Sequence, residues 1–317
     1  MLHNMSHALE QLDNGEYSIA WAGETPWHGL GKRVPNDLTA EQMMQAANVD
    51  WTVSKRPLYR KIDDEFHVTN MTALTRDTDN KILDYVPESW NENQNRDAFN
   101  FFHDYVMEGD MEMHTAGSLK GGQIVWALAK LKNNIVIGQK DVIENYMLFS
   151  NPHKFGKSID VRMTSVRVCC ANTLSMSLNE KSNQVAKVSH RMVFNKEEVK
   201  RTMGIVDHKN TQYSDALNFL TTKSYTKDTC EEFMQKIFPG NTKNDLSRNA
   251  NAVLGIIDTQ PGGELFPGTW YNALQAVTFF NSHAASRSDD TRLYNQWFGS
   301  TQKQNITALN LALEMAN

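Results

Sequence analysis

The sequence predicts an α+β fold, in which a mostly antiparallel sheet with helices fills the N-terminal two-thirds and the C-terminal part is helical. Alternation of apolar and polar residues clusters before residue 193, whereas helical spacing dominates after Phe194. The chain has 317 residues, of which 40% are hydrophobic, enough for a sizeable core. We therefore expect an α+β sheet domain over residues 1–193 and a mainly helical region, packed on it, over residues 194–317.

The N-terminal segment is expected to contain a loop and then a capped helix. Residues 21–33 are rich in glycine and contain two tryptophans, which indicates a loop. Thr39 precedes a run in which Met43, Met44 and Ala47 recur at helical spacing. Its hydroxyl can accept a hydrogen bond from the first turn, so we expect a helix that begins just after Thr39.

Two hairpins separated by a helix are predicted between residues 51 and 131. Trp51 and Val53 alternate with polar neighbours, and residues 76–80 supply the Asp and Asn that favour a turn. Lys120, Gly121 and Gly122 form a short connection of hairpin type. The expected elements are strands at 51–59, 66–75 and 81–86, a helix at 94–107, and strands at 111–119 and 123–131.

The rest of the chain is expected to hold short strands and then helices. Two Pro and three Gly residues make 258–268 a loop. After it, Leu274 and Val277 can face the core from one side of a helix. The expected elements are strands at 146–149, 158–163 and 185–192, and helices at about 270–282 and 301–315.

Charge is distributed unevenly along the chain. The formal net charge is -5, yet residues 114–201 contain 14 Lys and Arg against 6 Asp and Glu. The remainder then has 18 basic and 31 acidic residues, a balance of −13. Such a separation can place a positive surface on an acidic protein, although the basic residues could also scatter over several faces after folding.

Composition and motifs exclude several classes of protein. No apolar run approaches the roughly 18 residues of a membrane-spanning helix, and the N-terminal residues lack the pattern of a secretory signal. The chain has no phosphate-binding glycine motif and no zinc spacing of Cys and His, so we expect no cofactor. Cys169, Cys170 and Cys230 are too few and too oddly spaced for a disulfide framework, which indicates reduced thiols in a cytoplasm.

Basic residues and aromatic rings in this middle region point to a surface that binds nucleic acid. Phe155 stands between Lys154 and Lys157, so its ring is expected to be exposed and able to stack on a base. The plain alternatives are a solvated loop there and, around Lys120, a tight hairpin that needs glycine. The candidate nucleic-acid-binding residues are Lys120, Lys154, Phe155, Lys157, Arg162, Arg167 and Arg191.

Three acidic residues offer a weaker alternative, a metal site. Glu108, Asp110 and Glu112 alternate, and on one strand they would place three carboxylates on the same face. Such a cluster could hold Mg²⁺ for phosphoryl chemistry, whereas a solvated strand edge is the commoner outcome. No residue is assigned a catalytic role by this pattern alone.

Several motifs, taken together and in order, resemble a phage and plasmid protein family, the family of domain of unknown function 932. They include PWHGLG at 26–31, TAGSLKGG at 115–122, SNPHKFGKS at 150–158, VRVCCANTL at 166–174 and GTWYNALQAVTFF at 268–280. The resemblance covers nearly the whole chain. Its signature residues here are Trp27, His28, Gly29, Gly117, His153, Cys169, Asn172 and Thr173.

The resemblance implies a viral or plasmid protein in the cytoplasm of a host cell, and it supplies no established catalytic residue. The order of elements between residues 51 and 106 is also similar, at the level of fold, to phage single-strand annealing recombinases, which implies a homo-oligomer. We therefore expect a non-catalytic DNA-transaction protein that binds single-stranded nucleic acid and assists annealing or recombination. The alternatives are a metal-dependent nuclease, and an interaction protein whose acidic surface engages a host factor in an anti-defence role.

Overall fold

The computed structural model confirms the α+β class. It describes residues 9–23, 29–132, 134–167, 172–175, 185–188, 211–242, 245–284, 295–296 and 299–317. Two compact units are present. Unit 1 comprises the described residues within Met1–Lys132, Met147–Arg162 and Val185–Thr202, and unit 2 those within Asn133–Tyr146, Met163–Gln184 and Met203–Asn317. The predicted domain boundary at residues 193 and 194 lies outside the described residues.

The main sheet of unit 1 is mixed. Its first strands are β1 (Ile19–Ala22), β2 (Lys32–Val34), β6 (Met111–Leu119) and β7 (Ile124–Leu131). Strand β1 pairs with β2 in parallel and with β6 antiparallel, and β6 and β7 form the predicted hairpin. Unit 1 also holds part of β9 (Asp141–Pro152), part of β10 (Ile159–Arg167) and β12 (Val185–Val188), which pairs antiparallel with β10.

Two helices pack on β6 in unit 1, α1 (Ala40–Ala46) and α2 (Asn95–Glu108). The predicted cap of α1 is confirmed, because the Thr39 Oγ1 accepts a hydrogen bond from the Gln42 backbone at 3.2 Å. The Thr39 backbone N–H donates a 2.9 Å hydrogen bond to the Gln42 side-chain oxygen, which completes a capping box. Met43 and Met44 are buried, as their spacing predicted.

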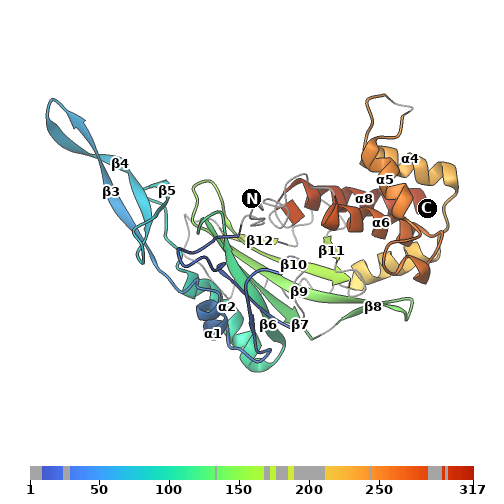
Figure 1. Ribbon diagram of the computed structural model, residues 1–317, viewed down its shortest axis with the longest axis horizontal. Coiled ribbons are helices and arrows are strands. Elements are labelled where there is room, and N and C mark those ends of the chain that lie inside the picture. Colours follow the sequence, from blue (N-terminus) through green and yellow to red (C-terminus); the bar gives the residue numbers. More distant parts are fainter. Residues whose placement is uncertain are drawn as a thin grey trace. The chain divides into compact units, whose positions relative to one another are not determined.

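A second sheet in unit 1 has three antiparallel strands in the order β3 (Val53–Ile62), β4 (Glu65–Arg76), β5 (Ile82–Pro87). The predicted hairpin of β4 and β5 is present, and β3 continues further than its sequence pattern indicated. Figure 1 shows β3 and β4 as a two-stranded arm that extends beyond β5. We call residues 56–68 of this arm the β-ribbon. Most of its side chains are exposed.

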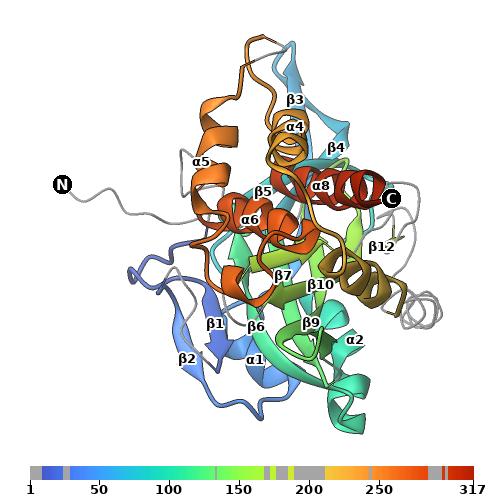
Figure 2. The same ribbon diagram turned by 90° about the vertical axis from the view of Figure 1, so that its right-hand side faces the viewer.

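Unit 2 contains short strand pairs and a group of helices. Strand β8 (Ile135–Ile137) pairs with the start of β9, and β11 (Asn172–Ser175) pairs with the end of β10. Its principal helices, grouped together in Figure 2, are α4 (Lys227–Ile237), α5 (Arg248–Ile256), α6 (Trp270–His283) and α8 (Ser300–Ala316).

Helix α6 is the centre of unit 2. Twelve of its 14 residues are buried, and it packs against α5, α8 and β11. Its Tyr271 hydroxyl donates a 2.7 Å hydrogen bond to the buried Asp141 carboxylate of β9. The predicted helices at 270–282 and 301–315 are therefore confirmed within a residue or two. Within the described part of the chain, no helix is long and apolar enough to cross a membrane.

Candidate nucleic-acid interface

Two loops of unit 1 meet and bring four of the predicted nucleic-acid-binding residues to one region. The loop between β6 and β7 holds Lys120, and the loop after β9 holds residues 154–157. The His153 backbone N–H donates to the Gln123 carbonyl at 2.9 Å, and Lys154 Nζ lies 3.4 Å from the Gln123 side-chain oxygen. We call this region the Lys/Phe cluster, comprising Lys120, Lys154, Phe155 and Lys157.

Glycine is required in the β6–β7 loop by close packing. Lys120, Gly121 and Gly122 have φ values of 53°, 65° and 95°, so three successive residues adopt left-handed conformations. A Cβ added at Gly122 would lie 2.9 Å from an Arg76 nitrogen and 3.1 Å from Leu83. The tight-hairpin interpretation of this motif is therefore correct, and the turn places Lys120 at an exposed tip.

The charge of Lys120 is disfavoured by its surroundings in the cluster. Partial burial, and then the positive charges of Lys154 and Lys157, lower the pKa of Lys120 below its ordinary value. A like charge nearby disfavours the charged form of Lys120. A phosphate between them would relieve that repulsion, which is the electrostatic property expected of an anion-binding site.

Phe155 presents its ring to solvent from an anchored loop. Its side chain is 51% exposed, as predicted, while its backbone N–H donates a 2.8 Å hydrogen bond to Asp84 of β5. Gly156 follows with a φ of 75°, which turns the chain back toward Lys157. The Asp84 carboxylate therefore fixes the loop, and it also contributes one negative charge beside the lysines.

His153 anchors the same loop from inside the protein. Its ring is fully buried, with Nε2 2.8 Å from the Asn95 side-chain oxygen and the ring centroid 5.1 Å from that of Trp51. The Asn95 amide in turn donates to the Val49 carbonyl at 3.0 Å. This signature histidine therefore holds the end of β9 against the start of α2, rather than facing solvent.

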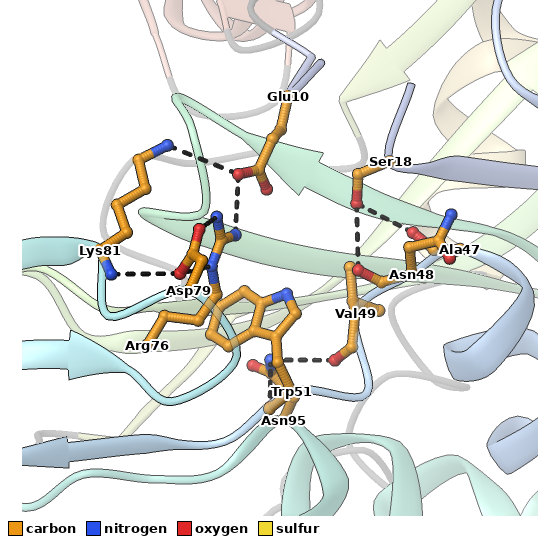
Figure 3. Close-up of polar contacts among 10 residues, drawn as sticks. All are labelled: Glu10, Ser18, Ala47, Asn48, Val49, Trp51, Arg76, Asp79, Lys81 and Asn95. Atoms are coloured by element: carbon orange, nitrogen blue, oxygen red, sulfur yellow. Dashed lines mark hydrogen bonds and ion pairs between the residues drawn. The ribbon is translucent and has the colours of Figure 1, made fainter. Parts of the chain in front are cut away.

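An ionic network with a buried centre, Arg76 and Glu10, continues from Trp51 (Figure 3). The Arg76 guanidinium lies over the Trp51 ring at 5.2 Å and donates to Glu10 at 2.7 Å. It also donates to both carboxylate oxygens of Asp79, at 2.6 and 3.0 Å, and Lys81 Nζ lies 3.6 Å from Glu10. Hydrogen bonding to Arg76 lowers the pKa of Asp79 to about 2. Burial opposes the charge of Arg76, but its hydrogen bonds to Asp79 and Glu10 raise the pKa overall.

Gly117, another signature residue, has a structural role in the sheet. It lies opposite Ile19, and a Cβ at this position would approach the Ser18 carbonyl to 2.7 Å. The Ser18 hydroxyl donates to the Ala47 carbonyl at 2.8 Å, as Figure 3 shows, and so links β1 to the end of α1. The glycine thus permits a close approach of β1 and β6.

The remaining predicted binding residues are not brought into the Lys/Phe cluster by the described structure. Arg162 is largely buried in β10 and forms an ion pair with Asp160, so we leave it out of the interface. Arg167 is the last residue of β10 and belongs to unit 2, and the structure describes only its backbone. Arg191 lies outside the described residues.

Other signature residues are described in part or not at all. Gly29 has a φ of 65° and no heavy atom within 4 Å of an added Cβ. Asn172 and Thr173 lie in β11, where only the backbone is described. Trp27, His28 and Cys169 lie outside the described residues.

The prediction that three carboxylates share one strand face is wrong. Glu108 is the last residue of α2, and Gly109, with a φ of 78°, turns the chain before β6. Of the three, only Glu112 lies in the strand, and Asp110 precedes it. Among the residues that the structure describes, no group of three or more His, Cys, Asp or Glu side chains could hold a metal ion.

Sequence reasoning missed the residues that support the cluster. Asp84 lies 71 positions before Phe155, and Asn95 lies 58 positions before His153. Neither belongs to a local motif, so only their place in the fold reveals their contacts.

Comparison with known proteins yields one finding. A family model described as "Domain of unknown function (DUF932)" matches residues 82–305, which is more than half of the chain. The matched segment includes the Lys/Phe cluster, Gly117 and His153. Comparisons with curated proteins and with solved structures gave no significant match.

Proposed function

We propose a nucleic-acid-binding function, starting from the premise that the chain belongs to the DUF932 family. In this proposal it is a non-catalytic protein of a phage or plasmid that binds single-stranded nucleic acid and assists annealing or recombination. It acts in the host-cell cytoplasm as a homo-oligomer. The Lys/Phe cluster is the binding surface.

The observation that carries the proposal is that Lys120 lies close to Lys154 and Lys157, in whose loop the ring of Phe155 is exposed. Two loops separated by more than 30 residues supply these side chains, and Gln123 joins the loops. The lysines would contact phosphates and release counterions, while the ring would stack on a base. A cationic surface with an aromatic platform is the combination that single-strand binders use.

The exposed ring favours an unpaired strand over a duplex. In a duplex the faces of the bases are already stacked on their neighbours, so a protein reads it through the grooves. An isolated phenylalanine on a loop gains little there, whereas each base it stacks on in a single strand is worth about 1–3 kcal/mol. Phe155 has half of its surface available for such stacking.

Fluorescence anisotropy of a labelled single-stranded oligonucleotide tests the proposal. Titration at about 50 mM salt is the most favourable condition, because phosphate contacts weaken as salt rises. We expect binding by the full chain, and much weaker binding by the double variant Lys154→Glu, Lys157→Glu. The slope of log affinity against log salt should fall by about 0.7 for each phosphate that the variant can no longer neutralise.

A matched charge reversal separates local contacts from net charge. The double variant Lys227→Glu, Lys303→Glu makes the same charge change on α4 and α8 of unit 2. It should retain most of the binding and the original salt slope. Absence of binding by the unmodified chain, or equally weakened binding in the two double variants, would overturn the proposal. Degradation of the oligonucleotide on addition of Mg²⁺ would favour the nuclease alternative instead.

A further inference from the structure

One acidic side chain lies beside the Lys/Phe cluster. Asp84 belongs to β5, and its carboxylate accepts a 2.8 Å hydrogen bond from the backbone N–H of Phe155. A negative charge at a surface that binds phosphates weakens that binding by repulsion. The place of this carboxylate in the candidate site therefore calls for a physical reason.

The carboxylate of Asp84 does not neutralise the lysines of the neighbouring loop. Within the described residues, no ion pair joins Asp84 to Lys154 or Lys157. The Lys154 Nζ lies instead 3.4 Å from the side-chain oxygen of Gln123. Because Asp84 binds a backbone N–H and not an ammonium group, its main local effect is on the position of the loop.

Residues 155–157 have few other attachments to the protein. The Lys157 backbone N–H donates to the Lys154 carbonyl at 3.3 Å, which is a bond within the loop, and a Cβ added at Gly156 would meet no heavy atom within 4 Å. In the part of the chain that the structure describes, the bond to Asp84 is the one hydrogen bond between these three residues and another element. It therefore sets where the Phe155 ring stands.

Asp84 is itself held by a strand ladder. It pairs with Leu74 in the antiparallel register of β4 and β5, and Leu74 is fully buried. A hydrogen bond from an N–H to a carboxylate is stronger than one between neutral groups. The Phe155 backbone is thus fixed before any ligand arrives, and a ring that is already placed loses less conformational entropy on binding.

We propose that Asp84 is a specificity-determining residue of the Lys/Phe cluster, an inference that rests on the proposed function. Its charge weakens the attraction for any chain of phosphates, whereas its hydrogen bond strengthens binding only of a ligand that can stack on Phe155. A strand with unpaired bases gains enough from stacking to offset the repulsion. A polyanion without bases experiences the repulsion alone, so the site selects unpaired bases over bare phosphates.

Two substitutions at this position separate the charge from the hydrogen bond. Asp84→Asn removes the charge and keeps an oxygen that can accept from the Phe155 N–H, whereas Asp84→Ala removes both. Since the two variants lose the same negative charge, a difference between them reports on the acceptor. Asp84 is not buried, so the circular dichroism of each variant should match that of the natural chain.

Competition against a labelled single-stranded oligonucleotide measures the selectivity of each full-length chain. The competitors are an unlabelled single strand and inorganic polyphosphate, which has phosphates but no bases, and the ratio of the two affinities is the selectivity. We expect Asp84→Asn to bind both competitors more tightly and to keep the ratio of the natural chain. In Asp84→Ala the ratio should fall by about fivefold or more relative to Asp84→Asn, which corresponds to the weaker end of stacking on an aromatic ring.

The same comparison without the ring shows whether Asp84 acts through Phe155. In a Phe155→Ala background, Asp84→Asn and Asp84→Ala should have equal selectivity, because no ring remains to be placed. Equal selectivity of the two variants when Phe155 is present would overturn this inference and leave the proposed function standing. So would a difference between them that persists without Phe155. A natural chain that binds no single strand would overturn the proposed function and this inference together.

Discussion

Glu10 is a carboxylate whose side chain is only 3% exposed, and Arg76 is its principal counter-charge. Arg76→Ala removes that partner and leaves Glu10 buried. Breaking a buried ion pair from one side costs about 3–5 kcal/mol, so we expect a decrease of that size in the free energy of unfolding. Urea denaturation measures it. Lys81→Ala removes a half-exposed cation 3.6 Å from the same Glu10 and should cost under about 1 kcal/mol. Equal destabilisation in the two variants would contradict the assignment of Arg76 as the main partner.

Asp79 gives the network a dependence on pH. Its pKa is lowered from 3.8 to about 2, chiefly by the hydrogen bonds from Arg76. A lowered carboxyl pKa stabilises the folded state above the unfolded value and loses that contribution as pH falls through the folded value. The stability difference between the natural chain and Asp79→Asn should therefore shrink between pH 4 and pH 2. Asp79 is 40% exposed, so solvent reduces the size of the effect. Asp37 is exposed, so Asp37→Asn serves as the control. If the stability difference between the natural chain and Asp37→Asn shrank equally over this pH range, Asp79 would not have this role.

Local composition predicted the exposed residues of the candidate site, but it could not predict their supports. Phe155 between two lysines in a glycine-containing loop indicated an exposed ring, and the structure exposes it. Asp84 and Asn95 hold that loop through contacts across 71 and 58 positions of the chain. No local spacing relates such residues, because their proximity depends on the pairing of the strands.

The pairing of β1 and β6 depends on the small size of Gly117. Gly117→Ala would place a Cβ 2.7 Å from the Ser18 carbonyl, so we expect a destabilisation of about 1–3 kcal/mol from overpacking. Gly255→Ala is the matched control, since an added Cβ there meets nothing within 4 Å and the residue lies in α5. It should stabilise by about 0.5–1 kcal/mol, the usual preference of a helix for alanine. Thermal or urea unfolding compares the two; a neutral Gly117→Ala would refute the close-approach argument.

Elements with strong local signals were predictable, and those set by distant pairing were not. Thr39 and Gln42 form a cap from residues three apart, so the start of α1 could be found from the sequence. The two strands of the β3–β4 ribbon were predicted at 51–59 and 66–75, but their pairing and the continuation of β3 to Ile62 were not, because the exposed residues of the ribbon lack the alternation that a buried face produces. At Glu108 an alternating pattern suggested a strand, but the residue completes α2 and Gly109 begins the turn.

The charge of the whole chain is -5, which opposes a polyanion at long range. At about 0.1 M salt, however, charges further apart than about 10 Å are largely screened. The local excess at the Lys/Phe cluster can then dominate binding, since partial burial and the nearby charges of Lys154 and Lys157 together lower the pKa of Lys120. We expect affinity for a single strand to exceed affinity for a duplex of the same sequence. Competition by unlabelled single strand and by unlabelled duplex against the labelled single strand checks this. Equal competition by the two competitors would contradict the stacking role of Phe155.

Hydrogen–deuterium exchange of the full chain, with and without excess single-stranded oligonucleotide at about 50 mM salt, tests the central claim most directly. Exchange reports on the two loops without any substitution. The proposed interface predicts slower exchange at residues 120–123 and 154–157, and unchanged exchange in α4 of unit 2. Unchanged exchange in both loops, or protection confined to other segments, would contradict the assignment of the Lys/Phe cluster as the nucleic-acid-binding surface.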